Sequence, residues 1–271
     1  MRCFASSLTL YFIVVSFIAT ANATNTHKFK VTTSQAAPVM IIGTIEKPKG
    51  DGPFPAVILL HGCAGLLPSW GGAWAKRLTK WGYVAFRIDS FGSRGVDNVC
   101  VGLSDLKGAI LRSPTLDERA VDALKAKSYL ETLSFVDKEK IALLGMSNGG
   151  ATTLAAIQNE YIGYVPNVSP FSAAVALYPY CPYKIRPGNP LLILIGDADE
   201  WTPSENCEKM RIRGPKSSLF ELIVYDGALH SFDIQDVRRE HSLGYVLDYH
   251  PQAAPDAYRR VREFFHQHLG R

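Results

Sequence analysis

The chain has 271 residues, of which 47% are hydrophobic, 20% charged and 11% aromatic, and this composition is typical of a globular protein. It excludes a disordered chain, a collagen, a coiled coil and a membrane protein with several spans. The 29 basic and 25 acidic residues leave a net charge of +4, with no basic block, which argues against a nucleic-acid-binding surface. The nearest approach to a basic cluster is Arg259, Arg260 and Arg262, which we interpret as the solvated face of an amphipathic helix.

Residues 1–23 are predicted to be a signal peptide. Arg2 precedes an apolar run over residues 8–18, and Ala21 and Ala23 occupy the −3 and −1 positions of a signal-peptidase site. The run is short for a permanent span of the bilayer, although an uncleaved anchor is the alternative. We therefore expect a mature chain of residues 24–271, periplasmic or secreted and without membrane contact. Removal of Cys3 leaves an even number of cysteines, as suits disulfides in an oxidising compartment.

Strands and helices alternate along the mature chain. Residues 29–33 and 38–46 predict a leading β-hairpin. Buried strands are then expected from short apolar runs at 56–60, 83–88, 141–144, 173–177, 191–195 and 219–224. Helical spacing predicts helices at 70–81, 114–133, 148–158 and 254–269. With no internal repeat and no break in composition, this pattern predicts one α/β domain with a mostly parallel sheet flanked by helices.

A candidate nucleophile lies at the turn after the strand 141–144. The sequence G-M-S-N-G-G at residues 145–150 places Ser147 where that strand gives way to a helix. A serine at such a sharp turn needs small residues two positions before and after it, and Gly145 and Gly149 meet this requirement. The alternative is a helix N-cap serine at a glycine-rich turn.

A serine nucleophile needs a base and an orienting carboxylate. His230 follows the last predicted strand, and ligands of an α/β sheet bind beyond the carboxyl ends of its strands, so His230 is expected on the same edge as Ser147. A packed loop histidine is the alternative. The acid should come from the loop after the strand 191–195, where Asp197, Asp199 and Glu200 compete. A cation site built from this acidic cluster is the rival interpretation.

A glycine-containing loop, H-G-C-A-G at residues 61–65, follows the first buried strand. The backbone N–H groups of Cys63 and Asn148 are the candidate oxyanion-hole donors. Cys63 is a weaker candidate for the nucleophile itself, because no strand-to-helix elbow surrounds it. We interpret His61 as structural, bonded to the loop backbone.

These motifs resemble the α/β-hydrolase fold and, more closely, the dienelactone hydrolase family. The resemblance extends over about residues 29–269 and includes the segments 61–65, 89–95, 145–150, 196–203 and 227–233. It implies an α/β-hydrolase fold and selects Asp199, three residues after Gly196, as the triad acid. The sequence departs from well-known dienelactone hydrolases in having Ser147 where they have cysteine. It also has Gly62 and Cys63 where they have a glutamate that helps to activate the thiol. Both groups specific to a cysteine nucleophile are therefore absent from these positions, and the resemblance implies the chemistry of a serine esterase.

The sequence thus predicts an exported serine hydrolase that cleaves ester or lactone bonds of small molecules without a metal or cofactor. Ser147, His230 and Asp199 form the expected triad. Arg94 is a candidate for binding a substrate carboxylate, with a structural salt bridge as the alternative. Two further functions fit the same motifs: that of a peptidase or acyltransferase relative, and that of a non-catalytic exported binding protein on the same fold.

The mature cysteines are expected to pair. Cys181 follows the strand 173–177 and Cys207 follows the acidic loop after the next strand. Because sequential strands are usually neighbours in such a sheet, we expect a Cys181–Cys207 disulfide. Cys63 and Cys100 are then the remaining pair, unless Cys63 stays a free buried thiol.

Overall fold

The structure is a computed structural model that describes residues 25–32, 38–100, 114–158, 165, 167–182, 184–185, 189–213, 220–235, 237–240 and 244–271. The predicted signal peptide, residues 1–23, lies outside the described residues. Within these ranges, no helix has both the length and the apolar character needed to cross a membrane.

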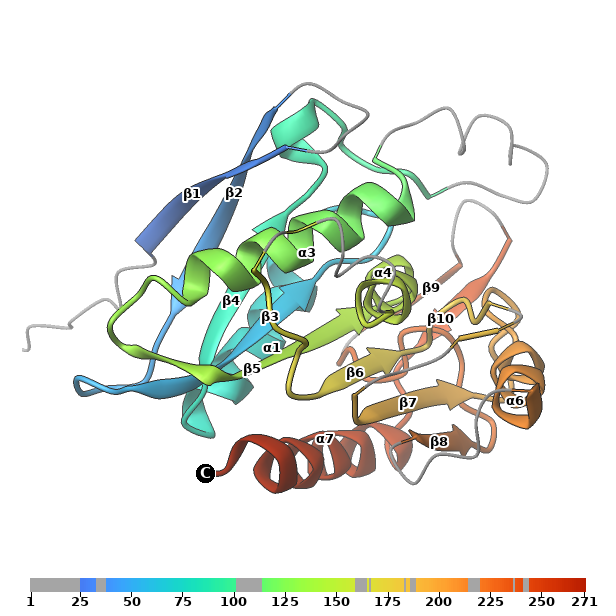
Figure 1. Ribbon diagram of the computed structural model, residues 1–271. Helices are drawn as coiled ribbons and strands as arrows, with labels where there is room; N and C mark the ends of the chain where they lie inside the picture. The colour runs from blue at the N-terminus through green and yellow to red at the C-terminus, as the bar shows by residue number, and fades with distance from the viewer. Residues whose placement is uncertain are drawn as a thin grey trace, which may run out of the picture.

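A single eight-stranded sheet forms the centre of the molecule, with the order β1-β2-β4-β3-β5-β6-β7-β8 (Figure 1). β1 pairs antiparallel with β2 and β2 antiparallel with β4, and every other neighbouring pair in this sheet is parallel. The prediction of a mostly parallel sheet that begins with a hairpin is confirmed. The strands are β1 Asn25–Val31, β2 Val39–Glu46, β3 Phe54–Leu60, β4 Val84–Asp89, β5 Val136–Met146, β6 Ala174–Leu177, β7 Leu191–Gly196 and β8 Phe220–Tyr225.

Helices cover both faces of the sheet. They are α1 Pro68–Lys80, α3 Leu116–Leu130, α4 Asn148–Ala156, α6 Ser204–Arg213 and α7 Ala253–Leu269, with a short 3₁₀ helix η1 at Gly92–Arg94. α3 crosses one face with α4 beside it, and α1 lies behind the sheet (Figure 1). α1 also contacts α7, where the rings of Trp74 and Tyr258 meet edge to face with centroids 5.5 Å apart. A capping box between Thr115 and Glu118 sets the start of α3.

The central strands are buried along their whole length. All residues of β3, β6 and β7 are buried, which matches their unbroken apolar sequences. β5 begins at Val136, earlier than the predicted residue 141, and its polar stretch from Asp137 to Lys140 is partly or fully exposed. A register shift against β3 accommodates this stretch: Phe54 pairs with Val136, but Ala56 pairs with Ile141.

Two features near the last sheet strand are absent from the sequence-based prediction. α6 has no predicted counterpart, and a small two-stranded sheet joins β9 (Arg238–Glu240) to β10 (Val246–Asp248). These strands are only three residues long, too short for periodicity to reveal. Leu247 of β10 also forms a parallel bridge with His230, so this small sheet supports the segment that carries the histidine.

Candidate active site

The candidate site lies at the carboxyl edge of the parallel strands. Ser147 follows β5, Asp199 lies in the loop after β7, and His230 lies in the loop after β8. All three side chains are buried. The structure therefore brings together three residues that are distant in sequence, at the edge where α/β sheets bind their ligands.

Ser147 occupies a strained turn between β5 and α4. Its backbone angles, φ 54° and ψ −117°, are rare for a residue with a side chain. A Cβ on Gly145 would lie 2.0 Å from the carbonyl oxygen of Gly149, and a Cβ on Gly149 would lie 2.1 Å from that of Leu60. Glycine is therefore required on both sides, and the turn presents the serine hydroxyl at the edge of the sheet.

A continuous chain of hydrogen bonds links the three side chains. The hydroxyl of Ser147 lies 3.0 Å from Nε2 of His230, and Nδ1 of His230 lies 2.7 Å from Oδ2 of Asp199. With the proton on Nδ1 donated to the carboxylate, Nε2 is free to accept the proton of the serine hydroxyl. This tautomer is the one in which the imidazole can act as a general base.

The carboxylate of Asp199 is fixed by its own loop. The backbone N–H groups of Trp201 and Thr202 each donate to Oδ1 at 2.9 Å, and the hydroxyl of Thr202 donates to Oδ2 at 2.8 Å. Asp197 has a different partner, since its Oδ1 accepts the backbone N–H of Gly227 at 2.7 Å. Asp199 therefore bonds the imidazole of His230, whereas Asp197 links the loop after β7 to the loop after β8. In the described part of the chain, no group of three or more His, Cys, Asp and Glu side chains could hold a metal ion, so the rival cation site is not formed there.

Aromatic rings and a second buried aspartate surround His230. The rings of Tyr178 and Trp201 lie 4.7 and 5.0 Å from the imidazole, centroid to centroid. The carboxylate of Asp233 accepts hydrogen bonds from Nε1 of Trp74 at 2.7 Å and from the hydroxyl of Tyr178 at 2.8 Å. Burial raises the pKa of Asp233. Sequence analysis gave these neighbours no role, because their partners come from distant segments.

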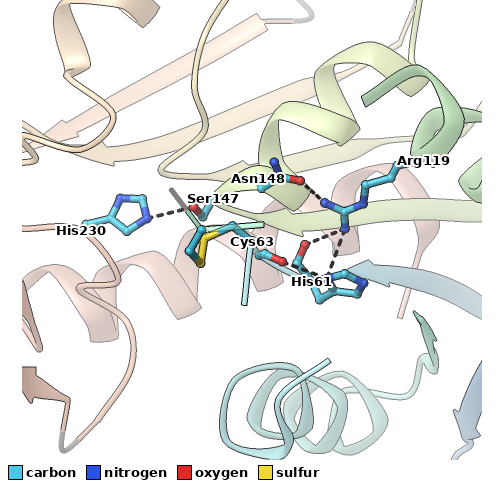
Figure 2. The surroundings of a disulfide bond; sticks show 8 residues. His61, Cys63, Arg119, Ser147, Asn148 and His230 are labelled. Atoms are coloured by element: carbon cyan, nitrogen blue, oxygen red, sulfur yellow. Dashed lines mark hydrogen bonds between the residues drawn. A yellow bond between two sulfur atoms is a disulfide. The ribbon is translucent and has the colours of Figure 1, made fainter. Parts of the chain in front are cut away.

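A disulfide borders the site on the side of the β3 loop. Cys63 is bonded to Cys100, and Figure 2 shows this bond beside Ser147 and Asn148. The carbonyl oxygen of Cys63 accepts the N–H of Val99 at 2.8 Å, while the N–H groups of Cys63 and Asn148 have no partner among the described residues. The bonded sulfur of Cys63 is not a free thiol, so the alternatives of a cysteine nucleophile and of a free buried thiol do not apply. The structure also joins Cys181 to Cys207.

Comparison with known proteins identifies the family. A model of the dienelactone hydrolase family matches residues 41–269. The chain belongs to the dienelactone hydrolase family. As a member of this family it is an enzyme, a hydrolase. A Yersinia pestis protein provisionally named carboxymethylenebutenolidase is 26% identical to it over 240 residues, which cover 83% of this chain and 82% of that protein.

Solved structures show the same fold. A dienelactone hydrolase-like promiscuous phosphotriesterase from metagenomic libraries has a TM-score of 0.70 at 19% identity, covering 91% of this chain and 99% of the other. An esterase from the Planctomycetes species Thermogutta terrifontis has a TM-score of 0.62 at 17% identity, covering 90% of this chain and 94% of the other. These likenesses confirm the predicted α/β-hydrolase fold.

Arg94 of this hydrolase is engaged within the protein. Its guanidinium donates to both carboxylate oxygens of the buried Asp122, at 2.8 and 2.9 Å, and to the carbonyl of Ser90 at 2.8 Å. This pairing is the structural salt bridge that sequence analysis gave as the alternative to a substrate contact. The geometry supports that alternative, and we do not assign Arg94 to substrate binding.

His61 is also engaged within the protein. Its Nδ1 donates to the carbonyl of Gly62 at 2.8 Å, and its Nε2 accepts the N–H of Ser90 at 3.3 Å. Burial lowers the pKa of His61 well below its ordinary value, and the positive charge of Arg119 lowers it further. A neutral imidazole that links β3 to the end of β4 agrees with the structural role expected for it.

Proposed function

We propose that this protein is an exported serine hydrolase that cleaves ester or lactone bonds of small molecules with Ser147, His230 and Asp199. The observation that carries the proposal is the continuous hydrogen-bond chain from the serine hydroxyl through the imidazole to the buried carboxylate. A serine, a base and an acid in this order and geometry are the requirements for acyl transfer through a serine ester.

In the proposed mechanism, Oγ of Ser147 attacks the acyl carbon while Nε2 of His230 takes the hydroxyl proton. Asp199 stabilises the imidazolium that forms. The carbonyl oxygen becomes an oxyanion, which accepts hydrogen bonds from the backbone N–H groups of Cys63 and Asn148. His230 then gives its proton to the leaving oxygen, and a water molecule, activated by the same histidine, releases the acyl group from Ser147.

The substrate class is supported by the relatives. The family is named for a lactone, a relative at 26% identity bears the name carboxymethylenebutenolidase, and a protein of the same fold is an esterase. Ser147 in place of the cysteine of well-known family members favours the ester chemistry of a serine enzyme. Both kinds of substrate present an acyl carbon bonded to oxygen, for which the same catalytic groups suffice.

Export is supported by two features. Residues 1–23 have the charge, apolar run and small residues of a cleaved signal peptide. The mature cysteines form two disulfides, Cys63–Cys100 and Cys181–Cys207, which persist in an oxidising compartment. We therefore propose a periplasmic or secreted enzyme of residues 24–271, and N-terminal sequencing of exported material should find Thr24 first.

Substitution of the nucleophile tests the proposal. The wild type and Ser147→Ala should be assayed on p-nitrophenyl esters of increasing chain length, on lactones and on a peptide amide. The alanine variant should keep its fold and lose kcat by on the order of 10⁴ to 10⁶. Ser172→Ala is the control, because Ser172 is half-buried just before β6, at the opposite edge of the sheet, and its hydroxyl donates to the carbonyl of Glu139 at 2.7 Å.

The outcomes distinguish the candidate functions. Ester hydrolysis by Ser147→Ala at the wild-type rate would refute the assigned nucleophile. Wild-type activity on the peptide amide, with none on esters or lactones, would indicate a peptidase. A folded wild type that hydrolyses none of these substrates and is not labelled by a fluorophosphonate would indicate a non-catalytic binding protein.

A further inference from the structure

A buried arginine lies beneath the proposed oxyanion hole. Arg119 belongs to the first turns of α3, and only 1% of its surface is exposed. Its Nη2 donates to the carbonyl oxygen of His61 at 2.7 Å, and its Nη1 donates to the side-chain oxygen of Asn148. The ring of Phe91 lies 4.8 Å from the guanidinium carbon.

These two contacts reach both segments that supply the oxyanion-hole donors. His61 precedes Cys63 by two residues in the loop after β3, and Asn148 is the first residue of α4, directly after Ser147. Figure 2 shows Arg119 bridging His61 and Asn148 on the side away from His230. Because one rigid guanidinium fork bonds both segments, it fixes their separation.

Among the described residues, no carboxylate forms a salt bridge with Arg119, although Asp122 and Asp89 lie near enough for their charges to act on it. The neighbouring Asp122 is paired with Arg94. Its Nε is buried and has no partner among the described residues. Burial lowers the pKa of Arg119 to about 9, with the negative charges of Asp122 and Asp89 acting in the opposite direction. A buried cation that bonds only neutral oxygens is costly for folding.

We propose that Arg119 is a positioning residue of the oxyanion hole, holding the N–H groups of Cys63 and Asn148 in register and favouring the oxyanion through its buried positive charge. The inference rests on the proposed function, because it needs an oxyanion to form at Ser147. In the described part of the chain no carboxylate bonds Arg119 directly, and the reaction transiently adds a negative charge at the neighbouring oxyanion hole. In a poorly solvated site a charge acts over longer distances than in water.

The proposal predicts that substitution of Arg119 weakens binding of the transition state and not binding of the substrate. Removal of one oxyanion-hole donor costs on the order of 10² to 10³ in kcat, so a shift in two donors that stay present should cost roughly 10 to 10². KM should change little, because the substrate carbonyl carries no full charge before attack. Arg119→Lys keeps the charge but not the fork, so it should recover part of the loss.

The test compares turnover with binding of a transition-state mimic. For wild type, Arg119→Met and Arg119→Lys, kcat and KM are measured with p-nitrophenyl acetate, together with the Ki of an alkyl trifluoromethyl ketone. The serine oxygen adds to this ketone, its proton passes to His230, and the former carbonyl oxygen becomes an oxyanion in the hole. Lys127→Met is the matched control: Lys127 is a buried cation on the same helix, bonded to Glu131 and Ser169.

Arg119→Met should raise the Ki of the ketone by the same factor by which it lowers kcat. Lys127→Met should leave both the Ki and kcat unchanged. Unchanged kcat, or a lower kcat with unchanged ketone affinity, in a folded Arg119→Met variant would overturn the proposal. If that variant does not fold, Asn148→Ala takes its place, since it removes the arginine's acceptor and keeps the backbone N–H. Unchanged ketone affinity in Asn148→Ala would also overturn it.

Failure of the proposed function is recognised separately. If Ser147 is not the nucleophile, the wild type itself binds the ketone no better than Ser147→Ala does, before any arginine variant is compared. That result would end the proposed role of Arg119 together with the triad. Tight ketone binding by the wild type, with none of the expected effects at Arg119, would refute the positioning role alone.

Discussion

Asp197 and Asp199 lie two residues apart on one loop, but their carboxylates have different partners. Asp199 accepts the Nδ1 proton of His230, whereas Asp197 accepts the backbone N–H of Gly227. Asp199→Asn should lower kcat on an ester by roughly 10⁴, because an amide nitrogen facing the imidazole favours the wrong tautomer. Asp197→Asn should keep most activity, since an amide oxygen can still accept the Gly227 N–H. Steady-state kinetics on both variants check this, and the reverse order of activities would exchange the two roles.

His61 should make the protein less stable in acid. Its pKa in the folded state is well below the ordinary value of 6.5, so below about pH 6.5 the unfolded chain binds a proton that the folded chain does not. The contribution of His61 to stability is therefore complete above pH 6.5 and is lost as the pH falls, by up to about 1.4 kcal/mol per pH unit.

Urea unfolding of wild type and His61→Gln between pH 8 and pH 5 measures this contribution. The free energy of unfolding of the variant should fall less steeply below pH 6.5 than that of the wild type. His266→Gln is the control, because His266 is exposed on α7. The unfolding free energy of this variant should fall with pH as steeply as that of the wild type. Parallel curves for wild type and His61→Gln would contradict the prediction.

At the scale of single elements, two helical glycines should respond in opposite ways to alanine. In Gly149→Ala the new methyl group would lie 2.1 Å from the backbone oxygen of Leu60, so β3 and α4 would have to separate. We expect loss of activity and a lower Tm. In Gly72→Ala, within α1, the nearest atom is Nη1 of Arg87 at 3.8 Å, an ordinary contact. The gain in helix propensity should stabilise the fold by about 0.5 to 1 kcal/mol.

Thermal unfolding and ester kinetics on the two purified variants check this contrast. Wild-type activity and stability in Gly149→Ala would show that the elbow is less tightly packed than the structure indicates. A lower Tm for Gly72→Ala would show that α1 does not accept a methyl group at this position.

For the whole molecule, the disulfides should dominate the response to reduction. Cys63–Cys100 and Cys181–Cys207 are 37 and 26 residues apart in sequence, and loop-closure entropy assigns each roughly 3 kcal/mol or slightly more of the free energy of unfolding. Mature exported protein should show no free thiol before reduction and four after it. A reductant should lower the Tm, which differential scanning calorimetry can follow.

Peptide mapping without reduction checks the pairing itself. Recovery of Cys181 joined to Cys63 or Cys100, or of any of the four cysteines as a free thiol in freshly exported protein, would contradict it. Unchanged thermal unfolding after complete reduction would show that the disulfides do not limit stability.

The sequence by itself determined the class of the sheet and the edge that bears the site. Apolar runs such as residues 56–60 and 191–195 indicate strands buried on both faces, and the glycines around Ser147 indicate the elbow, because each signal depends only on neighbouring residues. Parallel strands end at one edge, so the sequence also placed Ser147, Asp199 and His230 on a common side. Their hydrogen bonds, however, are seen only in the structure.

The tertiary structure alone decided the contacts between distant segments. β2 pairs with β4, Trp74 bonds Asp233 across 159 positions, and Arg119 bonds His61 across 58. Nothing in the sequence around Arg119 separates it from a surface arginine of an amphipathic helix. Its burial and its bonds to His61 and Asn148, beneath the proposed oxyanion hole, arise from how α3 packs on α4 and on β3. Such features depend on packing between elements, which local sequence patterns do not encode.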